Sequence, residues 1–169
     1  MKIGKPKLIL DPYEWLPGYG ESRVSFRSVG SDVILDIEYE KEVVVDIEEV
    51  VLALRREVAF KSVRCFIREP FPGGTIFEFD GDPSEFRLGK LTEFIDSELV
   101  RNNLKAWRSV SSHELPKLRH FSIQFLSENL TFHVLAVAVS LSTELSAICF
   151  RLEIILTRTA SVHQTLFSA

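Results

Sequence analysis

Alternating apolar and polar residues predict two β-hairpins in this chain. Over residues 23–40 the alternation is interrupted by a Val29-Gly30-Ser31-Asp32 turn, and over residues 120–141 it is interrupted at residues 127–130. A period of two residues is typical of strands with one buried face. We therefore expect the apolar face of the second hairpin to lie in the core; it carries Phe121, Ile123, Phe125, Phe132, Val134, Ala136 and Ala138.

The register of the second hairpin decides which of its polar residues are neighbours. A four-residue loop at residues 127–130 places Gln124 opposite His133. His120 then lies four residues along the sheet from that position, which is about 13 Å at the usual strand rise. The sequence therefore predicts that His120 and His133 cannot share a metal ion.

Helical spacing occurs in two other segments. Over residues 47–58 the apolar residues recur at helical positions, and Asp46 and Glu49 are spaced as a capping pair. A second helix is expected over residues 97–107, with Asp96 as its cap. Residues 145–156 fit both a helical stripe and a strand face, and their β-branched content slightly favours a strand.

Together these elements predict an α+β fold in a single domain covering residues 1–169. We expect one twisted, mainly antiparallel sheet of about six or seven strands, with about two helices packed on one face. Residues 1–22, rich in proline, glycine and aromatic residues, are expected to be irregular, and the polar residues 158–169 to be mobile. Further strands are expected at residues 7–10, 62–68 and 75–79.

Charge and composition narrow the classes of partner and location. The net charge of -4 and the isoelectric point near 5.6 argue against nucleic acid, because phosphate binding depends on clustered Lys and Arg. No apolar run reaches about 18 residues, so no membrane span is expected. Cys65 and Cys149 have apolar neighbours, as buried free thiols do, and residues 1–17 lack the pattern of a secretory leader. These features predict a cytoplasmic protein.

No residue pattern predicts catalysis, a metal site or a cofactor. The four histidines have neither His-x-His nor i, i+4 spacing, and the Gly73-Gly74 pair lacks the lysine of a phosphate-binding loop. Neither cysteine has a histidine arranged near it in sequence, and no G-x-S-x-G motif is present. We therefore expect no catalytic residue, no metal ligand and no cofactor.

The candidate binding residues are aromatic or polar. Tyr13, Trp15 and Tyr19 lie close together in the irregular N-terminal segment, where they either bind a partner or pack as a flap against one end of the sheet. Gln124 and His133 are candidates on the outer face of the second hairpin.

Two functions from different classes fit these observations. The first is a non-catalytic binding or protein-interaction module whose acidic surface suits a basic protein partner, with self-association as a further mode. The alternative is a small-ligand carrier or an enzyme. It predicts a pocket of about 300 Å³ or more between the sheet and its helices, lined by His113, Gln124 or His133.

Overall fold

The computed structural model of the protein describes residues 1–10, 22–45, 47–70, 77–78, 90–114, 117–125 and 128–146. One sheet contains β1 (Lys5–Leu10), β5 (Cys65–Pro70), β6 (Leu91–Ile95), β7 (Arg119–Phe125) and β8 (Leu130–Ala136). The other contains β2 (Ser22–Val29), β3 (Asp32–Val45), β4 (Glu48–Lys61), β9 (Ala138–Leu141) and β10 (Leu145–Ser146). The helix α1 spans Glu98–Arg108.

Both sheets are antiparallel throughout. The strand order of the first sheet is β1-β6-β7-β8-β5. The order of the second sheet is β10-β4-β3-β2, and β9 also pairs with β4. The chain passes from the first sheet to the second between β8 and β9, so the strand expected over residues 131–141 is divided between the two sheets.

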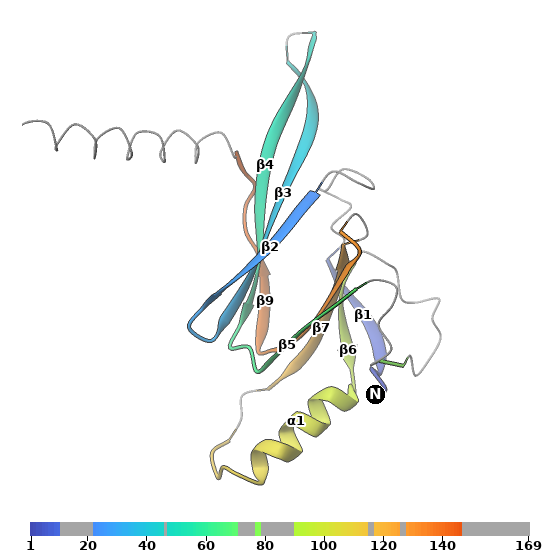
Figure 1. The fold of residues 1–169 in the computed structure, drawn as a ribbon, viewed down its shortest axis with the longest axis vertical. Helices are drawn as coiled ribbons and strands as arrows, with labels where there is room; N and C mark the ends of the chain where they lie inside the picture. Colours follow the sequence, from blue (N-terminus) through green and yellow to red (C-terminus); the bar gives the residue numbers. More distant parts are fainter. Residues whose placement is uncertain are drawn as a thin grey trace, which may run out of the picture.

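The expected α+β class, with one sheet and two helices, is therefore wrong. The fold consists of two antiparallel sheets facing each other, and α1 is the only helix in the described part of the chain (Figure 1). The error arises mainly from residues 47–58, where a helix is expected but residues 48–58 belong to strand β4.

The inward-facing residue Arg56 obscures the strand pattern of β4 in the sequence. Along β4 the side chains of Val50, Leu52, Leu54, Val58 and Phe60 share one face, but Arg56 interrupts the apolar alternation. Arg56 is tolerated there because it forms an ion pair of 3.6 Å with Glu144. Continuous pairing with β3, from Val33–Phe60 to Val45–Glu48, outweighs the helical spacing of the same residues.

The second predicted helix is confirmed as α1. Its N-cap residue is Ser97, whereas Asp96, the expected cap, has a φ of 61° and precedes it. Glu98 in the first turn and Lys105 and Arg108 in the last turn have the charges that the helix dipole favours. This helix begins where β6 ends, beside the first sheet (Figure 1).

The core lies between the two sheets. Phe60 of the second sheet and Phe121 of the first have ring centroids 5.9 Å apart, and both side chains are fully buried. The apolar face predicted for the second hairpin is confirmed as core except for Ala138, which belongs to β9. The buried cluster comprises Leu35, Ile37, Tyr39, Leu54, Val58, Phe60, Leu91, Phe121, Ile123, Phe125, Phe132, Val134 and Ala136.

Several other expectations are only partly tested. The strand at residues 7–10 is confirmed within β1, the strand at 62–68 overlaps β5, and β6 was not expected. Of residues 75–79 only 77–78 are described, and of residues 145–156 only 145–146, which form β10. Residues 158–169 lie outside the described part of the chain.

Candidate functional site

The most distinctive surface belongs to the β-hairpin of β3 and β4. Its outer part, residues 40–45 and 47–53, is called the arm here; it extends beyond the neighbouring strands of its sheet (Figure 1). Val43 pairs with Val50 and Lys41 pairs with Leu52 on the face that continues the core-facing pair Tyr39 and Leu54. The apolar lining of the core therefore runs on into the arm.

This face becomes more exposed toward the tip. At the base, the exposed fractions are 3 % for Tyr39 and 6 % for Leu54, whereas Val50 is 38 % exposed and Val45 is 53 % exposed. Ile47 at the tip is 97 % exposed and has a φ of 80°, a conformation that is unfavourable for a β-branched residue. A strained, exposed apolar tip of this kind often marks a functional position.

The opposite face of the arm is acidic. Glu40, Glu42 and Glu49 lie on it together with Val44 and Val51, and Glu48 lies beside the tip. In the described part of the arm, four carboxylates accompany a single lysine, Lys41. None of these four carboxylates forms an ion pair with another described residue, so their negative charge is available to a partner.

Two acidic residues closer to the body of the sheet, Asp36 and Glu57, are neutralised locally. Asp36 accepts hydrogen bonds from both Arg27 and Arg55, and Glu57 accepts from the same two guanidinium groups at 3.0 and 3.1 Å. Asp36 is 8 % exposed, so its charge needs these partners. The carboxylates of the arm differ from Asp36 and Glu57 in having no ion-pair partner among the described residues, and they share this property with Glu38 of β3.

The predicted site residues Gln124 and His133 are buried on the face of the first sheet that points away from the core. Their expected pairing is wrong, because Gln124 lies opposite Thr131 and His133 lies opposite Ser122. Phe125 pairs with Leu130, so the paired residues on either side of the turn are each one position earlier than a loop at residues 127–130 requires. Asn129 adopts a φ of 50°, which asparagine tolerates well. This shift moves every pair by two residues but keeps each side chain on its expected face.

The corrected register brings His120 and His133 into direct contact. His120 Nε2 lies 3.0 Å from His133 Nδ1, and His120 Nδ1 lies 2.7 Å from the Ser97 hydroxyl. Burial lowers the pKa of His120 to about 3, with a further contribution from His133, and burial lowers the pKa of His133 to about 4. Both imidazoles are therefore neutral near pH 7, and the predicted separation of about 13 Å is wrong.

The geometry of this chain of hydrogen bonds fits a structural role. Each neutral imidazole has one donor and one acceptor nitrogen, so the three side chains form one consistently directed chain. Ser97 is 1 % exposed and makes no capping bond to α1, because its hydroxyl is bonded to His120. The chain therefore fixes the start of α1 to β7 and β8. Among the described residues, no group of three or more potential ligands could hold a metal ion.

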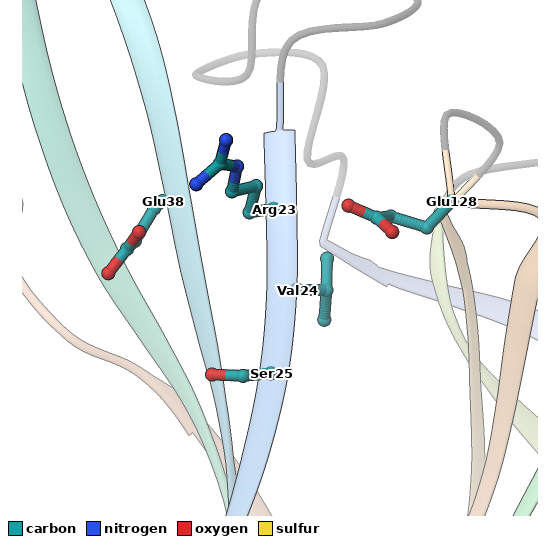
Figure 2. A pocket seen from close by; sticks show the side chains of 5 residues that line it. All are labelled: Arg23, Val24, Ser25, Glu38 and Glu128. Carbon is teal, nitrogen blue, oxygen red and sulfur yellow. The ribbon is translucent and has the colours of Figure 1, made fainter.

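A cavity of about 450 Å³ lies at the edge of β2. Arg23, Val24 and Ser25 of β2 line it with Glu38 of β3 and Glu128 of the connection between β7 and β8 (Figure 2). The side chains of Arg23 and Ser25 point to one side of β2 and that of Val24 to the other (Figure 2). The cavity is open to solvent. His113, Gln124 and His133 are not among its described lining residues.

Some predicted positions lie elsewhere. Tyr13, Trp15 and Tyr19 are outside the described residues, so their role as a binding loop or flap stays a prediction. His113 is exposed in the segment after α1, where its carbonyl oxygen accepts a hydrogen bond from Trp107 at 3.2 Å. The sequence did not predict the arm, because the helical spacing of residues 47–58 indicated a helix where the second strand of the arm lies.

Comparison of the chain with known protein families, curated proteins and solved structures finds no match. No described helix has the length and apolar character needed to cross a membrane.

Proposed function

We propose that this protein is an interaction module that binds a protein partner through the inner face of the arm. The observation that carries the proposal is the apolar row of Val43, Val45, Val50 and Leu52, which continues the core-facing row but becomes progressively exposed. Exposed apolar surface next to polar surface is typical of interaction sites. The buried Ser97–His120–His133 chain offers no accessible nucleophile, so a catalytic function has less support.

The charges of the arm favour one class of partner. The arm carries four carboxylates without described ion-pair partners: Glu48 lies on the same face as the apolar row, opposite Val45, and the other three lie on the opposite face of the same two strands. The whole chain has a net charge of -4. Two copies of the protein would bring like charges together, which opposes self-association through this surface. The partner proposed is therefore a segment of another protein that presents apolar side chains flanked by lysine or arginine.

A peptide of defined sequence can test this proposal in place of the natural partner. The probe is a labelled peptide of about six residues, a typical strand length, in which valine and lysine alternate. A scrambled peptide of the same composition lacks a single apolar face and is the control. We expect the alternating peptide to bind more tightly than the scrambled one in a fluorescence anisotropy titration, because only it can match an apolar face with basic neighbours.

Two matched double variants test the face of the arm that binds. Val43→Ser with Val50→Ser removes the inner apolar pair, and we expect a loss of affinity of at least about tenfold, or ~1.4 kcal/mol. Val44→Ser with Val51→Ser makes the same chemical change on the acidic face and should change the affinity less than about twofold. Equal effects of the two variants, or equal binding of both peptides, would contradict the proposal. A concentration-dependent dimer that competes with the peptide would support self-association instead.

A further inference from the structure

A second candidate site lies on the buried polar face of the first sheet. Glu69 of β5, Thr131 of β8 and Gln124 of β7 are neighbours across three adjacent strands, because Glu69 pairs with Thr131 and Thr131 pairs with Gln124. Paired residues project from the same face of a sheet, and adjacent strands lie about 4.8 Å apart. The long side chains of Glu69 and Gln124 therefore flank the shorter side chain of Thr131.

The two flanking side chains each carry a buried oxygen without a hydrogen-bond donor. Glu69 is 7 % exposed and Gln124 is 5 % exposed. Glu69 Oε1 and Gln124 Oε1 have no hydrogen-bond partner among the described residues. A buried acceptor without a donor is costly, and natural structures contain few of them, so two in one row indicate an absent partner.

The orientation of Gln124 is fixed from the other side. Its amide nitrogen donates a hydrogen bond of 3.1 Å to the Ser122 hydroxyl, which leaves the carbonyl oxygen as the free end of the side chain. Burial also raises the pKa of the Glu69 carboxyl group, as expected for a carboxylate that lacks a donor. The row consequently presents oxygens as its available groups: a carboxylate, an amide carbonyl and the hydroxyl of Thr131.

We propose that Glu69, Thr131 and Gln124 bind a primary ammonium group of a small molecule. An ammonium group has three N–H donors and one positive charge, which matches three oxygen acceptors of which one is a carboxylate. The row lies one residue from the ends of β5, β7 and β8, at the margin of the sheet. This site is separate from the arm and does not depend on the function proposed for it.

Side-chain NMR of Gln124 tests the site directly. The protein, labelled with ¹⁵N, is titrated with n-butylammonium chloride while the side-chain amide signal of Gln124 is followed. We expect a saturable shift with n-butylammonium and none with 1-butanol, tetramethylammonium chloride or sodium chloride. 1-Butanol lacks the charge, tetramethylammonium lacks N–H donors, and sodium tests for a metal ion. The same shift with sodium or with tetramethylammonium, or no shift with n-butylammonium, would overturn the proposal.

Variants separate binding at this row from a general charge effect. Glu69→Gln removes the charge and should weaken n-butylammonium binding at least tenfold, whereas Glu114→Gln makes the same change at an exposed position after α1 and should leave binding unchanged. Thr131→Val keeps the shape of the side chain and removes its hydroxyl, so it should weaken n-butylammonium binding severalfold. This variant provides an independent test if Glu69→Gln does not fold. Unchanged affinity in Glu69→Gln or Thr131→Val would overturn the assignment.

Discussion

At the residue scale, the buried histidine pair is the feature most sensitive to solution conditions. His120 is in ring contact with Phe77 and Phe94 as well as with His133, so few polar groups are available to stabilise a charge there. Protonating both imidazoles would place two positive charges in this environment and would break the directed chain of hydrogen bonds from Ser97. The folded state therefore binds these protons much more weakly than the unfolded chain does.

The stability of the protein should consequently fall in mildly acidic solution. The pKa of each histidine is near 6.5 in the unfolded chain and about 3 or 4 in the fold, so below pH 6.5 the unfolded state binds more protons. The stabilising contribution is complete above pH 6.5 and decreases by about 2 kcal/mol per pH unit between pH 6 and pH 5. Urea unfolding at a series of pH values measures this slope.

A double variant identifies the source of this pH dependence. Replacing His120 with phenylalanine and His133 with leucine removes both titrating groups and should flatten the profile between pH 6 and pH 5. A slope that persists in the double variant would show that other groups cause it. Glu93, whose pKa is lowered mainly by its hydrogen bonds to Arg119, loses its contribution only at lower pH, so it does not obscure this window.

At the scale of elements, the two hairpins of the second sheet make a useful contrast. The turn between β2 and β3 has Gly30 at a φ of 61°, whereas the tip between β3 and β4 has Ile47 at a φ of 80°. Glycine adopts positive φ without strain, but a β-branched residue does not. The arm therefore keeps an unfavourable residue at a position where its side chain is 97 % exposed.

Replacing this residue should separate stability from binding. Ile47→Gly should stabilise the fold by roughly 0.5–1 kcal/mol, because it removes backbone strain and almost no buried contact, although part of this gain is offset by the entropy of the unfolded glycine. The same variant should bind the alternating valine–lysine peptide less tightly. Gly30→Ala is the reverse change at the turn between β2 and β3. An added Cβ meets no atom within 4 Å there, so the positive φ alone should make this substitution destabilise the fold. Thermal unfolding of both variants measures these effects; destabilisation by Ile47→Gly would show that the tip is not strained.

The sequence predicts some of these elements well because their local pattern and their tertiary environment agree. The hairpin of β2 and β3 and the core face of β7 and β8 alternate without interruption, and α1 has its charges at the ends favoured by the helix dipole. In β4 the local sequence pattern and the tertiary environment disagree. The inward-facing Arg56 interrupts the apolar pattern, and its charge is balanced by Glu144, which lies 88 positions later in the chain. A partner so distant in sequence leaves no local signal.

The prediction of the candidate sites from the sequence depended even more on the register between paired strands. Gln124 and His133 were correctly selected as polar residues on one face, but a loop displaced by one position changed all their neighbours. The contact of His120 with His133 and the row of Glu69, Thr131 and Gln124 follow from this pairing and from the position of β5 beside β8. Hydrophobic periodicity specifies the face of a strand, and it does not specify the register between polar residues on that face.

At the scale of the whole molecule, contact between the two apolar sheet faces holds the fold together. Phe121 is fully buried and packs against Phe60 of the opposite sheet, whereas Phe26 of β2 is 49 % exposed, although its ring lies 5.0 Å from that of Phe66. Large buried side chains contribute in proportion to the area they remove from water and to the cavity that their removal leaves. The centre of the sandwich and its edge should therefore respond differently to the same truncation.

Truncation of these two phenylalanines tests this arrangement. Phe121→Ala should lower the free energy of unfolding by about 3–5 kcal/mol, because it leaves a cavity between the sheets. Phe26→Ala, the matched change at the exposed edge, should cost less than about half as much. Chemical denaturation provides both values, and similar losses would contradict the position assigned to the core.

The inner face of the arm is the surface proposed to bind a protein partner, and NMR can locate the bound peptide on the whole molecule. Backbone amide shifts of the ¹⁵N-labelled protein are mapped during titration with the alternating valine–lysine peptide. We expect the largest shifts at Val43, Val50 and Leu52. Shifts confined to Arg23, Val24 and Ser25 at the edge of β2, with none on the arm, would contradict the proposed binding surface.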